Sequence, residues 1–222
     1  YNMYEKGENI IMKKKKIIAL IITILIILVA IVIITKVVSS KNKDQESKLI
    51  KIYDTLTTSS AYEFTIEQSD NNKTIMAKKD DKTSIDQYSG DSHSTTLVEN
   101  GNTYLVLHDR KEYYIYERNN VEQSILTDGL KDLLGKSYTV GTEKIRGKNY
   151  NYEEYDGSTV FMISNTPQLD EDGVKTRIYF DKNSNIAYIK TIFGDQSELL
   201  KAKLTYDADD SLFEIPADYA EN

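Results

Sequence analysis

Residues capable of acid–base or nucleophilic chemistry are plentiful in this chain, but they form no catalytic pattern. The sequence contains no Gly-x-Ser-x-Gly, no His-Glu-x-x-His and no phosphate-binding loop. Carboxylate pairs such as Glu153 and Glu154 are neighbours on an expected strand, so their side chains point to opposite faces and cannot act together. Cysteine is absent, which excludes disulfides and thiolate chemistry. We therefore expect a protein that is not an enzyme.

Metal-binding patterns are also incomplete. The segment 181–185 begins like an EF-hand loop, but Ile186 occupies the position that needs glycine and Ile192 the position of the bidentate Glu. A hairpin turn explains this segment better. The two histidines, His93 and His108, are too few for a zinc site, and no third ligand is indicated. The sequence therefore predicts no metal and no cofactor.

Two further groups of polar residues have both a structural and a functional interpretation. The acidic runs 170–173 and 207–210 are typical of turns, with loose calcium binding as the alternative. Tyrosines cluster at 113–116 and 150–155, where they are favoured strand residues that cover a sheet and keep their hydroxyls in water. The alternative is a rim that holds glycans or lipid head groups. We prefer the structural interpretation in both cases.

An apolar segment near the N-terminus predicts a membrane anchor. Lys13–Lys16 lead directly into Ile17–Thr35, nineteen residues with only two threonines among aliphatic side chains. A helix of this length spans about 28 Å, close to the hydrocarbon thickness of a bilayer. The run is longer than the apolar region of a signal peptide, and no small residue follows before Ser39. We expect an uncleaved single-pass anchor, with cleavage near Ser39-Ser40 as the alternative.

The order of basic and apolar residues predicts the domain organisation. A dense basic region before the apolar run indicates a cytoplasmic N-terminus and an extracytoplasmic C-terminal domain at the cell membrane. Met12 opens a signal-type segment, so residues 1–11 are expected to be a spurious or disordered extension. Residues 12–43 then hold the basic region, the anchor and a linker, and residues 44–222 form one domain.

The composition of residues 44–222 restricts the partners of this domain. It holds 33 of the 35 acidic and 20 of the 28 basic residues, a net charge of −13. Such a charge disfavours nucleic acid and anionic lipid surfaces, so we expect no nucleic-acid partner. Abundant Lys, Ile, Asn and Tyr, with two prolines and no tryptophan, are typical of an AT-rich genome and favour a low-GC Gram-positive bacterium.

Hydrophobic periodicity predicts an α+β domain with two helices and about a dozen short strands. Residues 44–58 have the spacing of an amphipathic helix, and a second helix is expected between an Asn120/Gln123 capping box and Gly135. Asn100-Gly101 is a strong hairpin signal. Strands joined by such short turns form an antiparallel meander. They are expected at 62–67, 73–79, 82–88, 93–99, 102–108, 112–117, 138–146, 149–156, 159–164, 174–181, 186–193 and 197–206.

The C-terminal end carries a family resemblance. The last strand is followed by Asp210-Ser211-Leu212-Phe213-Glu214-Ile215-Pro216-Ala217-Asp218-Tyr219. This ending, with the order of helices and strands before it, resembles the LolA/LolB/RseB-type superfamily of lipoprotein carriers and sensors. The resemblance implies a strongly curved, open half-barrel around an apolar cavity, with the N-terminal helix and the helical insertion as a lid. This chain would be a membrane-anchored Gram-positive member that lacks the acylated cysteine.

The resemblance also implies a function. A tethered carrier cannot shuttle cargo, so we expect local binding of an apolar ligand, a lipid or lipoprotein acyl chain, in the concavity. The alternative is a protein-interaction or sensor module with a filled core, which engages a membrane or envelope partner; a structural envelope protein is a third possibility. The volume of the cavity distinguishes the first two, because a ligand needs an open cavity and the interaction module has a filled core. For every candidate lining residue, the alternative is that it packs in an ordinary core. The candidates are Tyr62, Phe64, Ile66, Tyr104, Val106, Tyr113, Ile115, Leu200, Ala202 and Leu204.

Overall fold

The computed structural model describes residues 46–117, 125–157 and 173–222, and Ser47–Asn222 form one compact unit. Strands dominate the described residues of this unit, which also form two α-helices and a short 3-10 helix. In chain order the elements are α2 (Lys48–Thr58), β1 (Ala61–Ser69), β2 (Asn72–Lys79), β3 (Lys82–Ser89), β4 (Ser92–Glu99), β5 (Asn102–Leu107), β6 (Glu112–Glu117), α3 (Ile125–Leu134), β7 (Tyr138–Ile145), β8 (Lys148–Asp156), β9 (Val174–Phe180), β10 (Ile186–Phe193), β11 (Gln196–Thr205), η1 (Asp210–Phe213) and β12 (Ala220–Glu221).

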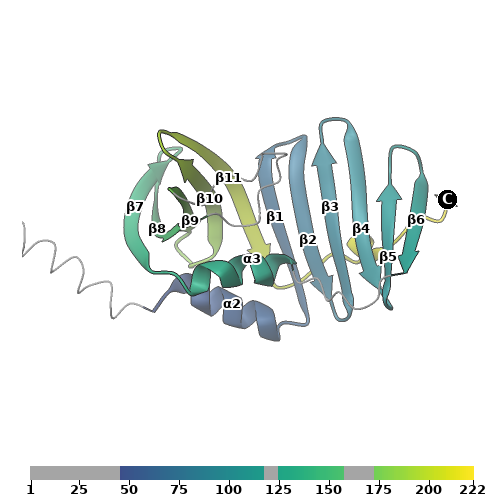
Figure 1. Ribbon diagram of the computed structural model, residues 1–222, viewed down its shortest axis with the longest axis horizontal. Coiled ribbons are helices and arrows are strands. Elements are labelled where there is room, and N and C mark those ends of the chain that lie inside the picture. Colours follow the sequence, from purple (N-terminus) through teal and green to yellow (C-terminus); the bar gives the residue numbers. More distant parts are fainter. Residues whose placement is uncertain (1–45, 118–124, 158–172) are drawn as a thin grey trace, which may run out of the picture. The chain divides into compact units, whose positions relative to one another are not determined.

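The strands form one open sheet built from two meanders. Its order is β12-β6-β5-β4-β3-β2-β1-β11-β10-β9-β8-β7, so the first meander joins the second where β1 pairs with β11. All neighbours are antiparallel except β12, which lies parallel to β6. The sheet curves strongly through β7–β11 and is flatter through β1–β6 (Figure 1). The result is a curved, mixed, twelve-stranded sheet, consistent with the expected half-barrel.

Short turns determine the register in both meanders. Asn100 and Gly101 both have positive φ, 51° and 79°, as a tight hairpin turn of the mirror-image type requires. The segment 181–185 is a turn between β9 and β10, in which Oδ1 of Asp181 accepts the backbone N–H groups of Asn183 and Asn185 at 2.8 and 2.9 Å. The hairpin predictions for both segments are confirmed.

Both helices pack on the same side of the sheet, in front of it in Figure 1. We call this side the helix face and the opposite side the outer face. Leu49, Ile52 and Leu56 of α2 and Leu126, Leu130 and Leu133 of α3 are buried in one cluster with apolar residues of β1, β2 and β8–β11. Burial of this apolar stripe, more than helix propensity, stabilises two helices as short as these.

A smaller cluster covers the outer face beneath the C-terminal segment. Phe213 of η1 and Ala208 are buried with Ala77 and Leu97, and Tyr104 packs against them with Leu212 and Ile215. The side chain of Asp209 caps η1 by accepting the N–H of Ser211 at 2.9 Å. The Leu-Phe-x-Ile ending that resembled a family tail therefore serves as the apolar cover of the outer face.

The expected strands agree with the structure to within about two residues wherever it describes them. Several predictions fall outside the described residues: the extension at 1–11, the basic region, anchor and linker at 12–43, the capping box at 120–123, the strand at 159–164 and most of the acidic run at 170–173. Within the described ranges, no helix has the length and apolarity needed to cross a bilayer. Strand β12 and its parallel pairing were not expected.

Candidate functional site

Six of the ten predicted lining residues lie together on the helix face. Phe64 pairs with Leu204 across the β1–β11 junction, and Ile66 pairs with Ala202. All six are buried in the cluster that α2 and α3 complete. The prediction that they surround a ligand stays a prediction, because in this structure the two helices occupy the space above them. The six are Tyr62, Phe64, Ile66, Leu200, Ala202 and Leu204.

The other four predicted residues lie on the outer face. Pairing places Leu97 opposite Tyr104, and Tyr104 opposite Ile115, so they share the face that Phe213 covers. Val106 and Tyr113 are paired with each other on the same side. These four therefore cannot line a concavity with Phe64, and we correct their assignment.

The error has a physical reason in β5. Its sequence, Asn-Thr-Tyr-Leu-Val-Leu, places apolar residues on both faces, Tyr104 and Val106 on one and Leu105 and Leu107 on the other. An alternating pattern indicates a face only when one set is polar. The pairing Thr96↔Leu105 decides the matter, because Thr96 pairs with Ile85, which packs against the helix-face cluster.

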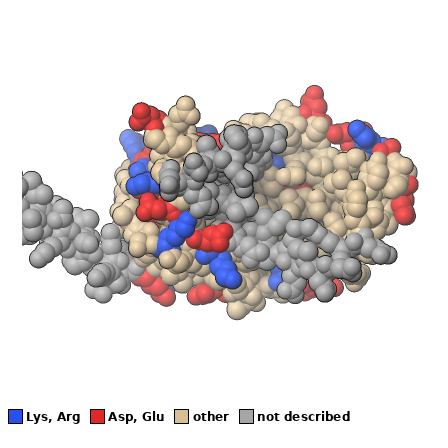
Figure 2. Space-filling model, viewed as in Figure 1, with Lys and Arg blue, Asp and Glu red and all other residues tan. Residues whose placement is uncertain are grey.

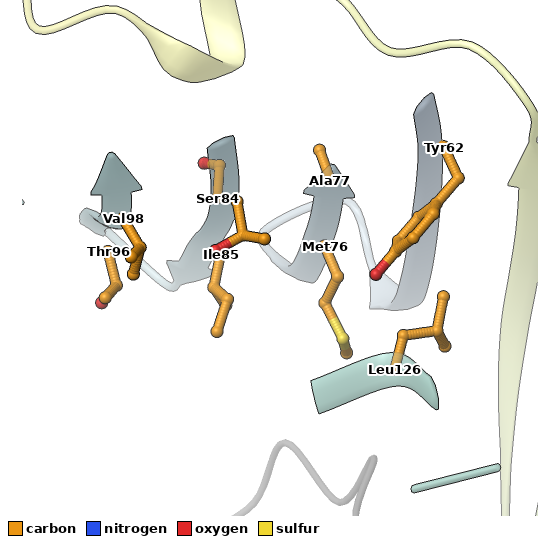
Figure 3. A pocket seen from close by; sticks show the side chains of 9 residues that line it. Tyr62, Met76, Ala77, Ser84, Ile85, Thr96, Val98 and Leu126 are labelled. Atoms are coloured by element: carbon orange, nitrogen blue, oxygen red, sulfur yellow. The ribbon is translucent and has the colours of Figure 1, made fainter. Parts of the chain in front are cut away.

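A small cavity lies where α3 meets β2–β4. Its volume is about 20 Å³, room for about one water molecule and far from an acyl chain. Met76, Ile85 and Tyr62 point toward α3, and Leu126 faces them from the helix (Figure 3). Thr96 and Val98 line the end farther from β1. This cavity is thus too small for an acyl chain, and it lies where the cover by α3 ends.

The helix face continues beyond this cavity. Register places Leu105, Leu107 and Tyr114 on it, and these side chains are half-buried. Tyr116, on the same face of β6, is 52% exposed. The helix-face cluster extends no farther than Ile85 of β3 among the described residues. The surface visible over β2–β5 is mostly uncharged where grey atoms do not cover it (Figure 2).

A buried carboxylate positions α2 on the sheet. Glu153 of β8 accepts hydrogen bonds from Ser47 Oγ at 2.8 Å, Lys48 N at 2.7 Å and Leu49 N at 3.3 Å. The Tyr155 hydroxyl donates to the same carboxylate at 2.7 Å, and its burial raises the Tyr155 pKa. Ser47 Oγ in turn accepts the N–H of Ile50. Glu153 satisfies free amides at the helix start, where negative charge is favoured.

The outer face of β7–β10 carries a charged network instead. Glu143 accepts from the Tyr179 hydroxyl at 2.6 Å, Arg177 Nη1 at 2.8 Å and Lys190 Nζ at 2.9 Å. The Tyr179 hydroxyl, followed by Lys190 and Arg177, lowers the Glu143 pKa to about 2. Glu154 pairs with Arg177 on this face while Glu153 lies on the helix face, as the sequence predicted. The network links β7 to β9 and β10 through charged and hydroxyl groups, so it is not a surface for an apolar ligand.

A second, wider depression of about 410 Å³ lies on the outer face at β11–β1–β2. Its lining is charged, with Glu63, Glu67 and Asp70 beside lysines, and Lys201 forms an ion pair with Glu67 at 2.7 Å. A groove of mixed charge is a poor place for an acyl chain, because the chain would displace water from ionised groups without replacing their hydrogen bonds.

One cluster of polar residues was not predicted from the sequence. Asp86, His93 and His108 come together on the outer face, with ligand-capable atoms all within 4.8 Å of one another. Burial lowers the pKa of His108, and the neighbouring His93 acts in the same direction. The strand register could have revealed this cluster. Two tight hairpins place Asp86 beside Thr95 and Thr95 beside Val106, and His93 and His108 each lie two residues from these positions on the same face.

Comparisons with known proteins do not assign a family. No family model and no curated protein matches the sequence. An uncharacterised conserved protein from Thermus thermophilus matches in structure with 9% identity and a TM-score of 0.45, over 80% of this chain and 99% of that one. The Mycobacterium tuberculosis lipoprotein LppX matches with 14% identity and a TM-score of 0.39, over 70% and 93%. These similarities are too weak to carry an argument.

Proposed function

We propose that this chain is a non-catalytic binding domain for an apolar ligand, a lipid or lipoprotein acyl chain, held on the helix face of its curved sheet. The observation that carries the proposal is that the apolar helix face extends past the helices that cover it. The cluster beneath α2 and α3 ends at Met76 and Ile85, while apolar side chains continue on this face at Val98 of β4 and at Leu105 and Leu107 of β5, beside hydroxyl-bearing Ser and Thr residues. The cavity at Leu126 is where a ligand would begin to lift α3.

A buried hydroxyl on this face supports the proposal. Thr103 pairs with Val98, a residue of the cavity lining, and is only 8% exposed. Its Oγ1 has no hydrogen-bond partner among the described residues. An unpaired buried hydroxyl is costly, and a ligand with a carboxyl or ester oxygen would satisfy it.

The energetics of such binding need no catalytic residue. Burial contributes about 0.8 kcal/mol per CH₂, so a twelve-carbon chain would gain roughly 10 kcal/mol before the cost of ordering it. Part of that gain must replace the contacts that α3 loses when it moves, because the present cavity is too small. The affinity for the ligand therefore depends on the difference between the free energy gained by burying the acyl chain and the packing free energy lost when α3 moves.

Native mass spectrometry of residues 44–222, purified from bacteria without detergent and then incubated with palmitate, tests the proposal. We expect adducts with the mass of a fatty acid or lipid that disappear on denaturation. Val98→Lys places a charge in the cavity lining and should reduce adduct occupancy roughly tenfold. Leu199→Lys is the matched control, because Leu199 is 38% exposed on the outer face.

A protein-interaction module is the second candidate, and the small volume of the cavity beneath α3 favours it. Strand β7 is the last strand of the sheet and has a strand partner on only one side within the described residues. A peptide from a membrane or envelope partner could extend the sheet there. An unchanged apo mass after incubation with lipid would exclude acyl-chain binding and favour this candidate. The membrane anchor and extracytoplasmic location remain part of both proposals.

A further inference from the structure

The polar cluster on the outer face of β3–β5 is built by register. Asp86 of β3 pairs with Thr95 of β4, and Thr95 pairs with Val106 of β5. His93 lies two residues before Thr95, and His108 lies two residues after Val106, on the same face. Strands β3 and β4 and the first residue after β5 therefore bring one carboxylate and two imidazoles to one place.

The contacts within the cluster are short. Asp86 Oδ1 lies 2.7 Å from His93 Nε2 and 2.5 Å from Thr95 Oγ1, and Thr95 Oγ1 lies 2.8 Å from His108 Nε2. Asp86 is 4% exposed, and no Lys or Arg forms an ion pair with it among the described residues. A buried carboxylate without such a partner favours a bound cation, because burial strengthens the attraction.

A tyrosine hydroxyl holds one of the two imidazoles from its other side. The Tyr219 hydroxyl lies 3.0 Å from His108 Nδ1, on the side of the ring away from Thr95. A partner at the distal nitrogen orients a metal-binding imidazole and raises its basicity. The hydroxyl therefore holds the His108 ring with its Nε2 directed toward Thr95 and the other two side chains of the cluster.

We propose that Asp86, His93 and His108 form a binding site for one divalent transition-metal ion, with Tyr219 as a positioning residue. Two imidazoles and one carboxylate are a donor set that suits zinc and its neighbours in the first transition row. The two rings are stacked, with centroids 3.7 Å apart and planes 10° from parallel. Ion binding must therefore tilt the rings apart, so that both Nε2 lone pairs can converge. The site is independent of the helix face, because all three residues lie on the outer face.

Isothermal titration of the full chain with Zn²⁺ near pH 7.5, in non-ionic detergent and without a histidine tag, tests the proposal. We expect one ion per chain. His93→Gln and His108→Gln should each weaken binding by at least roughly tenfold, and Tyr219→Phe by about tenfold while His108 remains. Asp195→Asn, in the β10–β11 turn away from the cluster, is the control and should leave the affinity unchanged.

A spectroscopic readout does not depend on variants. The chain has two histidines and no cysteine, so every imidazole resonance and every imidazole–Co²⁺ absorption band reports this cluster. Zn²⁺ should shift the Nε2 resonances of both rings together. Absence of saturable binding would overturn the proposal. Binding that survives the double His93→Gln/His108→Gln substitution would also overturn it, because surface carboxylates would then be holding the ion. Thermal unfolding in EDTA confirms that each variant is folded.

Discussion

At the scale of single residues, Glu153 shows how one carboxylate determines where a helix lies. It joins β8 to the first turn of α2 through Ser47, Lys48 and Leu49, residues more than 100 positions away in the chain. Both ends of this contact are buried, so the donors have no water to replace the carboxylate.

Glu153→Gln should therefore destabilise the fold. The amide keeps one acceptor oxygen but places an NH₂ group against amide and hydroxyl donors, so we expect the free energy of unfolding to fall by about 2 kcal/mol. Urea denaturation followed by circular dichroism measures this change. Glu214→Gln is the control, since Glu214 is exposed and surface changes of this kind cost about 0.5 kcal/mol or less. An equal loss in both variants would contradict the capping role.

Glu143 predicts a pH dependence at the same scale. Its folded pKa is about 2, below its ordinary value of 4.5, so the unfolded state binds the proton more readily between these values. The stabilisation is complete above about pH 4.5 and is lost as the pH falls toward 2. The stability difference between wild type and Glu143→Gln should therefore shrink over this window. A difference that stays constant from pH 6 to pH 2.5 would contradict the assignment.

At the scale of elements, the two faces of the sheet are covered in different ways. Helices α2 and α3 cover the helix face over β1 and β8–β11, whereas the irregular C-terminal segment covers the outer face over β2–β5. The C-terminal segment is held at several points: Lys111 forms an ion pair with Asp218, and Ala220 N donates to Lys111 O at 2.9 Å. Its apolar anchor is Phe213.

Phe213→Ala should remove that anchor. Phe213 is 5% exposed, and loss of a buried phenylalanine costs about 3 to 5 kcal/mol; the lower end applies here because the segment lies near the surface and can relax. We expect a loss of about 3 kcal/mol in denaturant unfolding. Leu212→Ala is the comparison, since Leu212 is only half-buried and should cost less. A variant as stable as wild type would show that the segment does not stabilise the sheet.

At the scale of the whole unit, the pairing of β1 with β11 joins two meanders into one sheet. Five residue pairs cross this junction, and both strands place their apolar residues in the same core. Because the junction lies in the middle of the strand order, we expect its amide hydrogen bonds to break only on global unfolding. Strand β7, at the edge, has no such protection on one side within the described residues.

Hydrogen exchange should reflect this position. Amides in the centres of β1 and β11 are expected to exchange slowest, near the global unfolding rate, and those on the free side of β7 on the order of 100-fold faster. Mass spectrometry of exchanged peptides measures both regions in one experiment. Equal protection at β7 would indicate that another segment or partner pairs with that edge.

The sequence by itself determined most of the helices and strands of the described residues, with η1 and β12 as the exceptions. Alternation in 62–67, the Asn100-Gly101 turn and the 3/4 spacing of α2 depend on neighbours in the chain, so local patterns suffice to predict them. The face of β5 could not be predicted, because both sides of that strand are apolar and only its pairing with β4 distinguishes them. The junction of β1 with β11 and the cluster of Asp86, His93 and His108 likewise depend on pairing between strands. Only the tertiary structure decided them, because the residue pattern within one strand does not specify which other strand it pairs with, or in which register.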